Sequence, residues 1–159
     1  MGRQNETWRN SAYLENHNSD YDGNYIEGRV FVGMAFDVPS DISDEYQAIK
    51  RACKKVGLET IRVDDIPGSG PIPMRVIREI ENAEFIIFDL SKERPNVYYE
   101  LGYAHGVGNR EQEILLIAKE GSNVHFDVAQ LASKQYKSAT ELERMLPALL
   151  REMIRITRK

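Results

Sequence analysis

The chain has 159 residues, of which 42% are hydrophobic and 29% are charged, the ordinary balance of one globular domain. Its formal net charge of -4 provides no general basic field, so a nucleic-acid partner is not expected. A single cysteine, Cys53, excludes a disulfide framework and a thiolate metal cluster, and no apolar run reaches the about 20 residues of a membrane-spanning helix.

The first residues are polar and rich in Asn, and they lack the apolar stretch of a signal peptide. A cytoplasmic location without membrane attachment is therefore the expectation. We interpret residues 1–28 as a flexible polar arm, one that would order only against a partner subunit, and residues 29–159 as one α/β domain.

Two kinds of hydrophobic pattern alternate along the domain. Short apolar runs bounded by Gly, Pro or charged residues predict strands over residues 29–35, 58–63, 85–88 and 114–118. Apolar residues at spacings of three and four predict helices over residues 42–56, 72–83, 97–107 and 142–154. The alternation predicts a flavodoxin-like (Rossmannoid) three-layer sandwich, with a doubly wound, mostly parallel sheet in the order 2-1-3-4. A short fifth strand is expected at residues 135–136.

In such a sheet, ligands bind at the carboxyl ends of the strands, where the strand order reverses. Here that point lies between the first and third strands, which are followed by residues 33–37 and 89–96. The second strand would bring Asp64 and Asp65 to the same rim.

Two carboxylates near this rim are the candidates for chemistry. Glu100 falls in what we expect to be the first turn of a helix, where the helix dipole would keep it ionised for attack on an anomeric carbon. The alternative is a solvated glutamate that simply favours this position. Asp89 ends an apolar strand, and it either binds a sugar hydroxyl and orients Glu100, or hydrogen-bonds the amides of an adjoining turn.

Several other chemistries are disfavoured. The G-x-G-x-x-G and G-x-x-x-x-G-K-[ST] phosphate-binding motifs are absent, and Asp41, Asp44 and Glu45 would repel a pyrophosphate. The three histidines are too scattered to suggest a metal site. No cofactor and no metal are expected.

Longer stretches of sequence carry a family resemblance. The segments VFVGMAF (residues 30–36), AEFIIFDLS (83–91), RPNVYYELGYAH (94–105) and FDV (126–128) resemble those of nucleoside 2-deoxyribosyltransferase-like and TIR-like predicted nucleotide-binding proteins. The resemblance implies that Glu100 is the glutamate that acts on the sugar, that Asp89 and the first loop face the substrate, and that the protein is a homo-oligomer. The substrate-binding residues expected around this centre are Gly33, Met34, Phe36, Asp64, Asp65, Asn96 and Tyr99.

The functional hypothesis is cleavage of the N-glycosidic bond of a nucleoside, nucleotide or NAD-like substrate, by hydrolysis or by transfer. The basic stretch at residues 92–96 replaces an acidic, glycine-containing stretch of the transferases, which would suit a phosphorylated substrate. The alternatives are a non-catalytic nucleotide sensor and a TIR-like self-associating signalling domain.

Overall fold

The computed structural model describes residues 25–35, 43–62, 72–107, 111–129 and 131–159. Within these residues lies a sheet of five strands: β1 (Ile26–Met34), β2 (Glu59–Ile61), β3 (Ala83–Asp89), β4 (Ile114–Lys119) and β5 (Lys134–Tyr136). Their order is β2-β1-β3-β4-β5, and every neighbouring pair is parallel. The predicted flavodoxin-like order is thus confirmed, including the short fifth strand.

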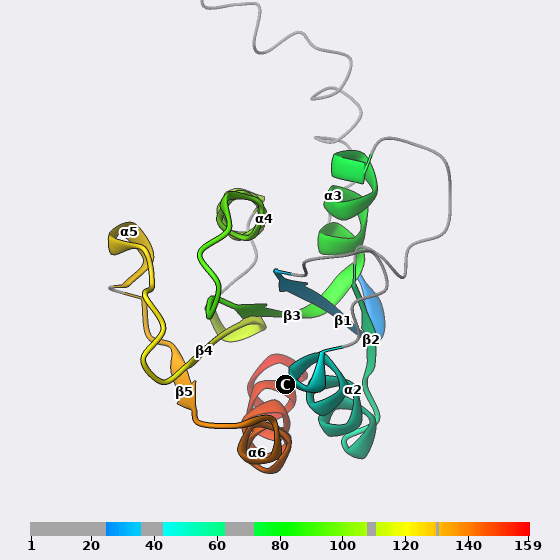
Figure 1. Cartoon of the computed structure of the whole chain (residues 1–159). Coiled ribbons are helices and arrows are strands. Elements are labelled where there is room, and N and C mark those ends of the chain that lie inside the picture. The colour runs from blue at the N-terminus through cyan, green and yellow to red at the C-terminus, as the bar shows by residue number, and fades with distance from the viewer. Residues whose placement is uncertain (1–24, 36–42, 63–71, 108–110, 130) are drawn as a thin grey trace, which may run out of the picture.

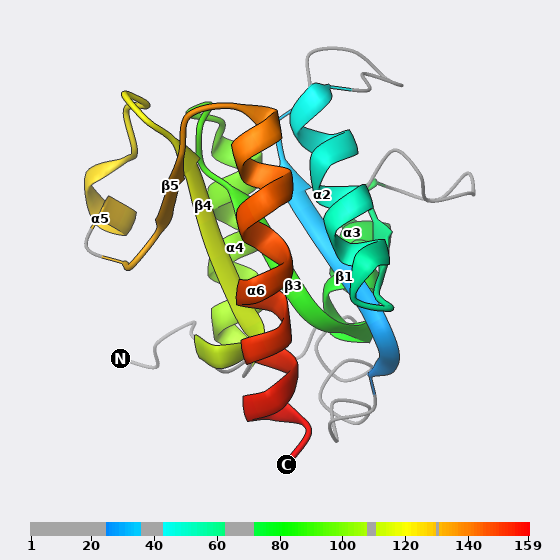
Figure 2. The ribbon, with the colours of Figure 1, turned by 90° about the horizontal axis from the view of Figure 1, so that it is seen from below.

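Helices cover both faces of the sheet. Figure 1 shows α3 (Ile72–Asn82) and α4 (Pro95–Gly106) above the sheet, and α2 (Asp44–Lys55) and α6 (Ala139–Thr157) below it. The helices α2 and α6 run side by side, as Figure 2 shows, and Arg51 and Lys55 of α2 both pair with Glu143 of α6. A 3-10 turn (Glu111–Glu113) and the one-turn helix α5 (Phe126–Ala129) were not predicted, because each is too short to show a period.

Local sequence signals explain several helix ends. The Ser43 hydroxyl accepts a hydrogen bond from the backbone amide of Tyr46, and so caps α2. Beyond the other end of α2, Gly57 takes a positive φ of 77°, which glycine adopts without steric cost. The first residue of α4 is Pro95, whose fixed φ suits that position. The N-cap of α4 is therefore Arg94.

The sheet separates two hydrophobic cores. Alternate strand residues, among them Val30, Val32, Phe85 and Ile87, pack against α2 and α6. The residues between them, among them Phe31, Ile86 and Phe88, pack against α3 and α4. Since side chains alternate across a strand, a shift of one position moves a residue from one core to the other.

A buried ion pair joins the amino end of the sheet to the end of the chain. The Glu84 side chain is fully buried, and it accepts two hydrogen bonds from Arg158, at 2.6 and 2.7 Å, and one from the backbone amide of Gly28 at 2.6 Å. Strand β1 begins at Ile26, three residues before the predicted strand, so this amide lies within it.

Two further features are the environment of Cys53 and the length of the helices. Cys53 is buried in the core, and burial raises the pKa of its thiol to about 12, so the thiolate does not form at neutral pH. No helix in the described part of the chain has both the length and the apolar character to cross a bilayer.

Candidate functional site

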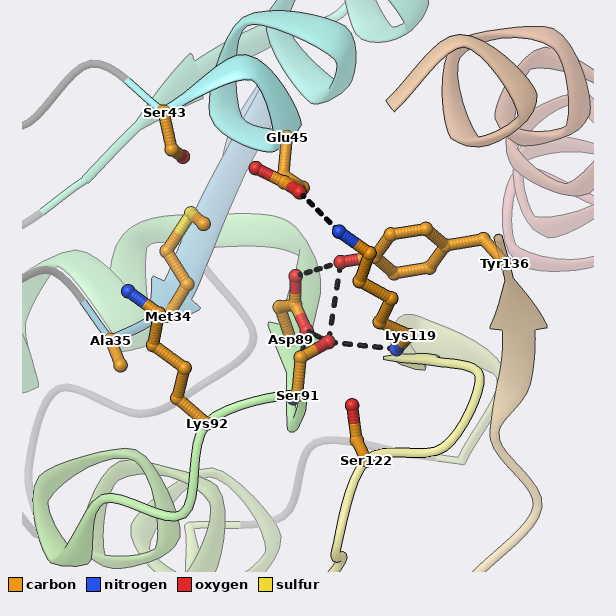
Figure 3. A pocket seen from close by; sticks show the side chains of 10 residues that line it. All are labelled: Met34, Ala35, Ser43, Glu45, Asp89, Ser91, Lys92, Lys119, Ser122 and Tyr136. Atoms are coloured by element: carbon orange, nitrogen blue, oxygen red, sulfur yellow. Dashed lines mark hydrogen bonds and ion pairs between the residues drawn. The ribbon is translucent and has the colours of Figure 1, made fainter. Parts of the chain in front are cut away.

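A cavity of about 190 Å³ opens at the carboxyl end of the sheet, beside β3 and the start of α2. Figure 3 shows the ten residues that line it, which are Met34, Ala35, Ser43, Glu45, Asp89, Ser91, Lys92, Lys119, Ser122 and Tyr136. They come from the ends of β1, β3, β4 and β5 and from the first turn of α2. The cavity thus lies at the reversal of strand order, where the topology predicted a ligand site.

Asp89 is the most deeply buried acidic residue of the cavity wall, with 4% of its surface exposed. Its carboxylate accepts hydrogen bonds from the Ser91 amide (2.9 Å), the Ser91 hydroxyl and the Tyr136 hydroxyl (2.8 Å). Burial raises the pKa of Asp89, and the donors from Ser91 and Tyr136 offset part of that rise. Of the two roles expected for Asp89, the hydrogen bond to the amide of an adjoining turn is the one that the structure contains.

Ser91 and two lysines shape the polar side of the cavity. The Ser91 hydroxyl accepts a hydrogen bond from the Lys119 amide at 2.7 Å and lies 3.2 Å from the Tyr136 hydroxyl. The Lys119 ammonium pairs with Glu45 at 3.3 Å. Lys92 reaches along the opposite side of the cavity, toward Met34 and Ala35 (Figure 3). The cavity therefore has a cationic group on each of two sides and hydroxyls between them.

Glu100 occupies a different environment. It lies in the second turn of α4, and not in the first as predicted, because the helix begins at Pro95. Its carboxylate reaches the end of β1: a Cβ built on Gly33 would be 3.2 Å from Glu100 Oε2. Burial raises the pKa of Glu100 to about 7. The expectation that the helix dipole keeps this group fully ionised is wrong, because the loss of solvent outweighs a dipole effect that fades beyond the first turn.

The two candidate carboxylates lie on opposite faces of the sheet. Asp89 points, with Phe85 and Ile87, to the side of α2 and α6, where it meets Tyr136. Glu100 descends from α4 onto the other face, next to Phe88 and Gly33. No hydrogen bond joins Asp89 to Glu100 among the described residues, and the donors that hold Asp89 are Ser91 and Tyr136. Among the described residues there is therefore no contact through which Asp89 would orient Glu100.

The end of β1 links these two environments. Gly33 faces Glu100, while the next residue, Met34, lines the cavity. Asn96 and Tyr99, the predicted substrate-binding residues of α4, are both exposed, Tyr99 with 61% of its surface. The predicted residues Phe36, Asp64 and Asp65 lie outside the described residues.

Sequence reasoning missed most of the cavity lining. Lys119 and Tyr136 are the last residues of β4 and β5. The rule that ligands bind at the carboxyl ends of strands was applied to the first three strands, and it would have found both residues if it had been extended to the fourth and fifth. Ser91 and Lys92 lie in the segment 89–96 that the sequence placed at this rim, but a surface serine and lysine carry no signal of their own. Glu45 was considered only as a charge that repels phosphate, and its partner Lys119 is 74 residues away in sequence.

Comparison with known proteins supports the fold described above. No family model and no curated protein match this sequence. Among solved structures, the CMP N-glycosidase BcmB from Clostridium botulinum superposes with a TM-score of 0.53 at 18% identity, over 76% of this chain and 98% of that one. A mutant flavo di-iron protein from Thermotoga maritima superposes with a TM-score of 0.54 at 16% identity, over 93% of this chain and 41% of that one. At such identities the likeness shows a shared fold, and the family suggested by the sequence stays a prediction.

Proposed function

We propose that this protein cleaves the N-glycosidic bond of a nucleotide, with Glu100 acting at the anomeric carbon. The observation that carries the proposal is the position of the Glu100 carboxyl group, which is partly buried against Gly33 at the end of β1. A carboxyl group with a pKa of about 7 that lies at the switch point of a parallel sheet is a typical catalytic group, since such sites shift pKa values toward the working pH.

The chemistry needs the ionised form of Glu100. A carboxylate can attack C1′ as the bond to the base breaks, or can stabilise the positive charge that develops on the sugar. The base leaves with the bonding electrons and takes up a proton from the solvent. Water or a second base then completes hydrolysis or transfer.

In this proposal the sugar phosphate lies in the polar cavity, where the pair with Lys119 offsets the negative charge of Glu45. The Ser122 hydroxyl suits a hydrogen bond to a ribose or a phosphate, and Lys92 and Lys119 offer positive charge. The cavity's volume of about 190 Å³ is below the about 300–1,000 Å³ that is typical of sites for whole ligands, so it would hold only part of a nucleotide. A nucleotide whose phosphate lies in the cavity beside Met34 would extend across the end of β1 to Gly33. Its sugar would then lie next to Glu100. The activity of the similarly folded protein on CMP supports a nucleotide as the substrate.

The second candidate function is a nucleotide sensor without catalysis. The observation that favours it is the separation of the cavity from Glu100, since Glu100 is not among the lining residues. A ligand confined to the cavity would then bind without meeting the reactive group. Self-association of the TIR-like kind stays a prediction from the sequence.

Base release separates these functions. Wild type, Glu100→Gln and the matched control Glu59→Gln, an exposed glutamate at the other end of the sheet, are incubated with cytidine, CMP, AMP and NAD. Released base is measured by chromatography, and folding by circular dichroism. We expect release by wild type and by Glu59→Gln, and a loss of at least about a hundredfold in Glu100→Gln. Full activity of Glu100→Gln would overturn the proposal, while binding of a nucleotide with no release by wild type would establish the sensor.

A further inference from the structure

A second cavity, of about 470 Å³, lies on the other side of α4 from Glu100. Its lining residues are Glu93, Pro95, Tyr98, His125 and Val128, from the start of α4 and from the segment around α5. Tyr98 and Glu100 are two positions apart on one helix, so they point about 200° apart around its axis. The cavity is therefore separate from the proposed catalytic group.

Two rings form an aromatic wall of this cavity. The Tyr98 and His125 ring centroids are 5.6 Å apart, and the ring planes are inclined by 57°. The backbone amide of His125 donates a hydrogen bond to the Tyr98 hydroxyl at 3.0 Å. This bond ties the phenol ring to the segment before α5, so the wall is formed before a ligand arrives and little side-chain freedom is lost on binding.

The charge of the lining selects among aromatic ligands. Pro95 and Val128 provide apolar surface, and Glu93 is the one acidic side chain among the described lining residues, which include no lysine or arginine. Aromatic faces attract cations through the ring quadrupole, and a carboxylate at the rim adds to that attraction. The volume lies within the range of small-molecule sites.

We propose that this cavity binds a planar aromatic cation, which stacks on the Tyr98 ring and meets the inclined His125 ring at an angle, with its positive group toward Glu93. The site is independent of the reaction proposed for Glu100. The polar cavity near Asp89 differs in charge, because two lysines, Lys92 and Lys119, are among its lining residues.

Three probes that share a benzene ring but differ in charge test the proposal. Benzamidinium, benzamide and benzoate are titrated against the full chain, with binding followed by ligand-observed NMR. We expect benzamidinium to bind most tightly, benzamide less tightly and benzoate least. Equal binding of all three, or no binding of benzamidinium, would overturn the proposal.

Variants locate the binding. His125→Ala removes a ring from an exposed position and should weaken benzamidinium by about tenfold. Glu93→Gln should abolish the preference for benzamidinium over benzamide, and Tyr98→Phe, which keeps the ring, should retain most of the binding. Glu100→Gln should bind as wild type does. Loss of binding in Glu100→Gln with unchanged binding in His125→Ala and Glu93→Gln would assign the probe to the other side of α4 and contradict the proposal.

Discussion

Gly33 lies against the carboxylate of Glu100, and the lack of a side chain at Gly33 is what makes room for it. A Cβ at this position would be 3.2 Å from Glu100 Oε2 and 2.3 Å from two carbons of the Phe88 ring. The sequence predicted Gly33 as a substrate-binding residue. In the structure, it allows a side chain of α4 to approach.

Gly33→Ala should therefore damage both packing and activity. The methyl group would force Phe88 and Glu100 to move, at a cost of about 1–3 kcal/mol in the free energy of unfolding, and base release should fall at least about tenfold. The matched control is Gly102→Ala in α4, where a Cβ would meet nothing within 4 Å. That change should stabilise the helix by about 0.5–1 kcal/mol. Equal effects of the two substitutions in urea unfolding would contradict this account of Gly33.

The pH dependence of base release should follow Glu100. Because the carboxylate is the form that acts at C1′, and burial raises the pKa of Glu100 to about 7, kcat/KM should increase with pH up to about 7 and then level off. A rate that instead falls above this pH would identify Glu100 as a proton donor and would refute its role as nucleophile or charge stabiliser.

Glu100 should also lower the stability of the protein at high pH. Its pKa is about 7 in the folded protein and near 4.5 when unfolded, so the native state binds more protons between these values, and stability falls as the pH rises through that window. Glu100→Gln removes the cost of burying the charge. We expect its free energy of unfolding to exceed that of wild type by about 2 kcal/mol at pH 8, and to differ little from it below about pH 4.5. Thermal and urea unfolding at both pH values measure this difference, and a Glu100→Gln variant less stable at pH 8 would contradict it.

Lys92 should distinguish a nucleotide from a nucleoside. Lys92→Ala removes one of the two lysines from the polar cavity, and we expect the KM for CMP to rise about tenfold while the kinetics with cytidine change little. The control is Lys134→Ala, an exposed lysine at the start of β5. An equal rise in KM for both substrates would show that Lys92 does not contact the phosphate.

The ion pair between Glu84 and Arg158 should be a pH-dependent source of stability. Burial raises the pKa of Glu84, but the hydrogen bonds from Arg158 and Gly28 outweigh it, so the pKa lies below its usual value. The stabilisation is therefore present above the unfolded pKa of Glu84 and is lost as the pH falls. Arg158→Ala should cost about 2–3 kcal/mol at pH 7, because it leaves a buried carboxylate without its main partner.

Arg155→Ala is the control for this prediction. Arg155 belongs to the same helical segment, but its pair with Glu152 is solvent-exposed on both sides, and such pairs contribute little. Urea unfolding at neutral and acidic pH compares the two variants. A penalty for Arg158→Ala that does not shrink in acid, or that Arg155→Ala matches, would contradict the role of the buried pair.

Local patterns in the chain were sufficient to predict the strands and the helix that carries Glu100, because the periods of 2 and 3.6 are written in neighbouring residues. The alternation of strands and helices then predicted the strand order and both helical layers. The same patterns predicted the rim of the sheet that holds the polar cavity. They also predicted that Asp89 would be paired or functional, since a charge that ends an apolar strand needs partners.

The environments of the two carboxylates depended on the tertiary structure. Asp89 is held by Tyr136, 47 residues away in sequence, and Glu100 is desolvated beside Gly33 of a distant strand. The alternation of side chains along β3 turns Asp89 toward α2 and α6, while α4 brings Glu100 to the other face of the sheet. The packing of α4 raised the pKa of Glu100 where a local rule predicted an ionised group. Burial and pairing are sums over residues that only the folded chain brings together, so no window of sequence contains them.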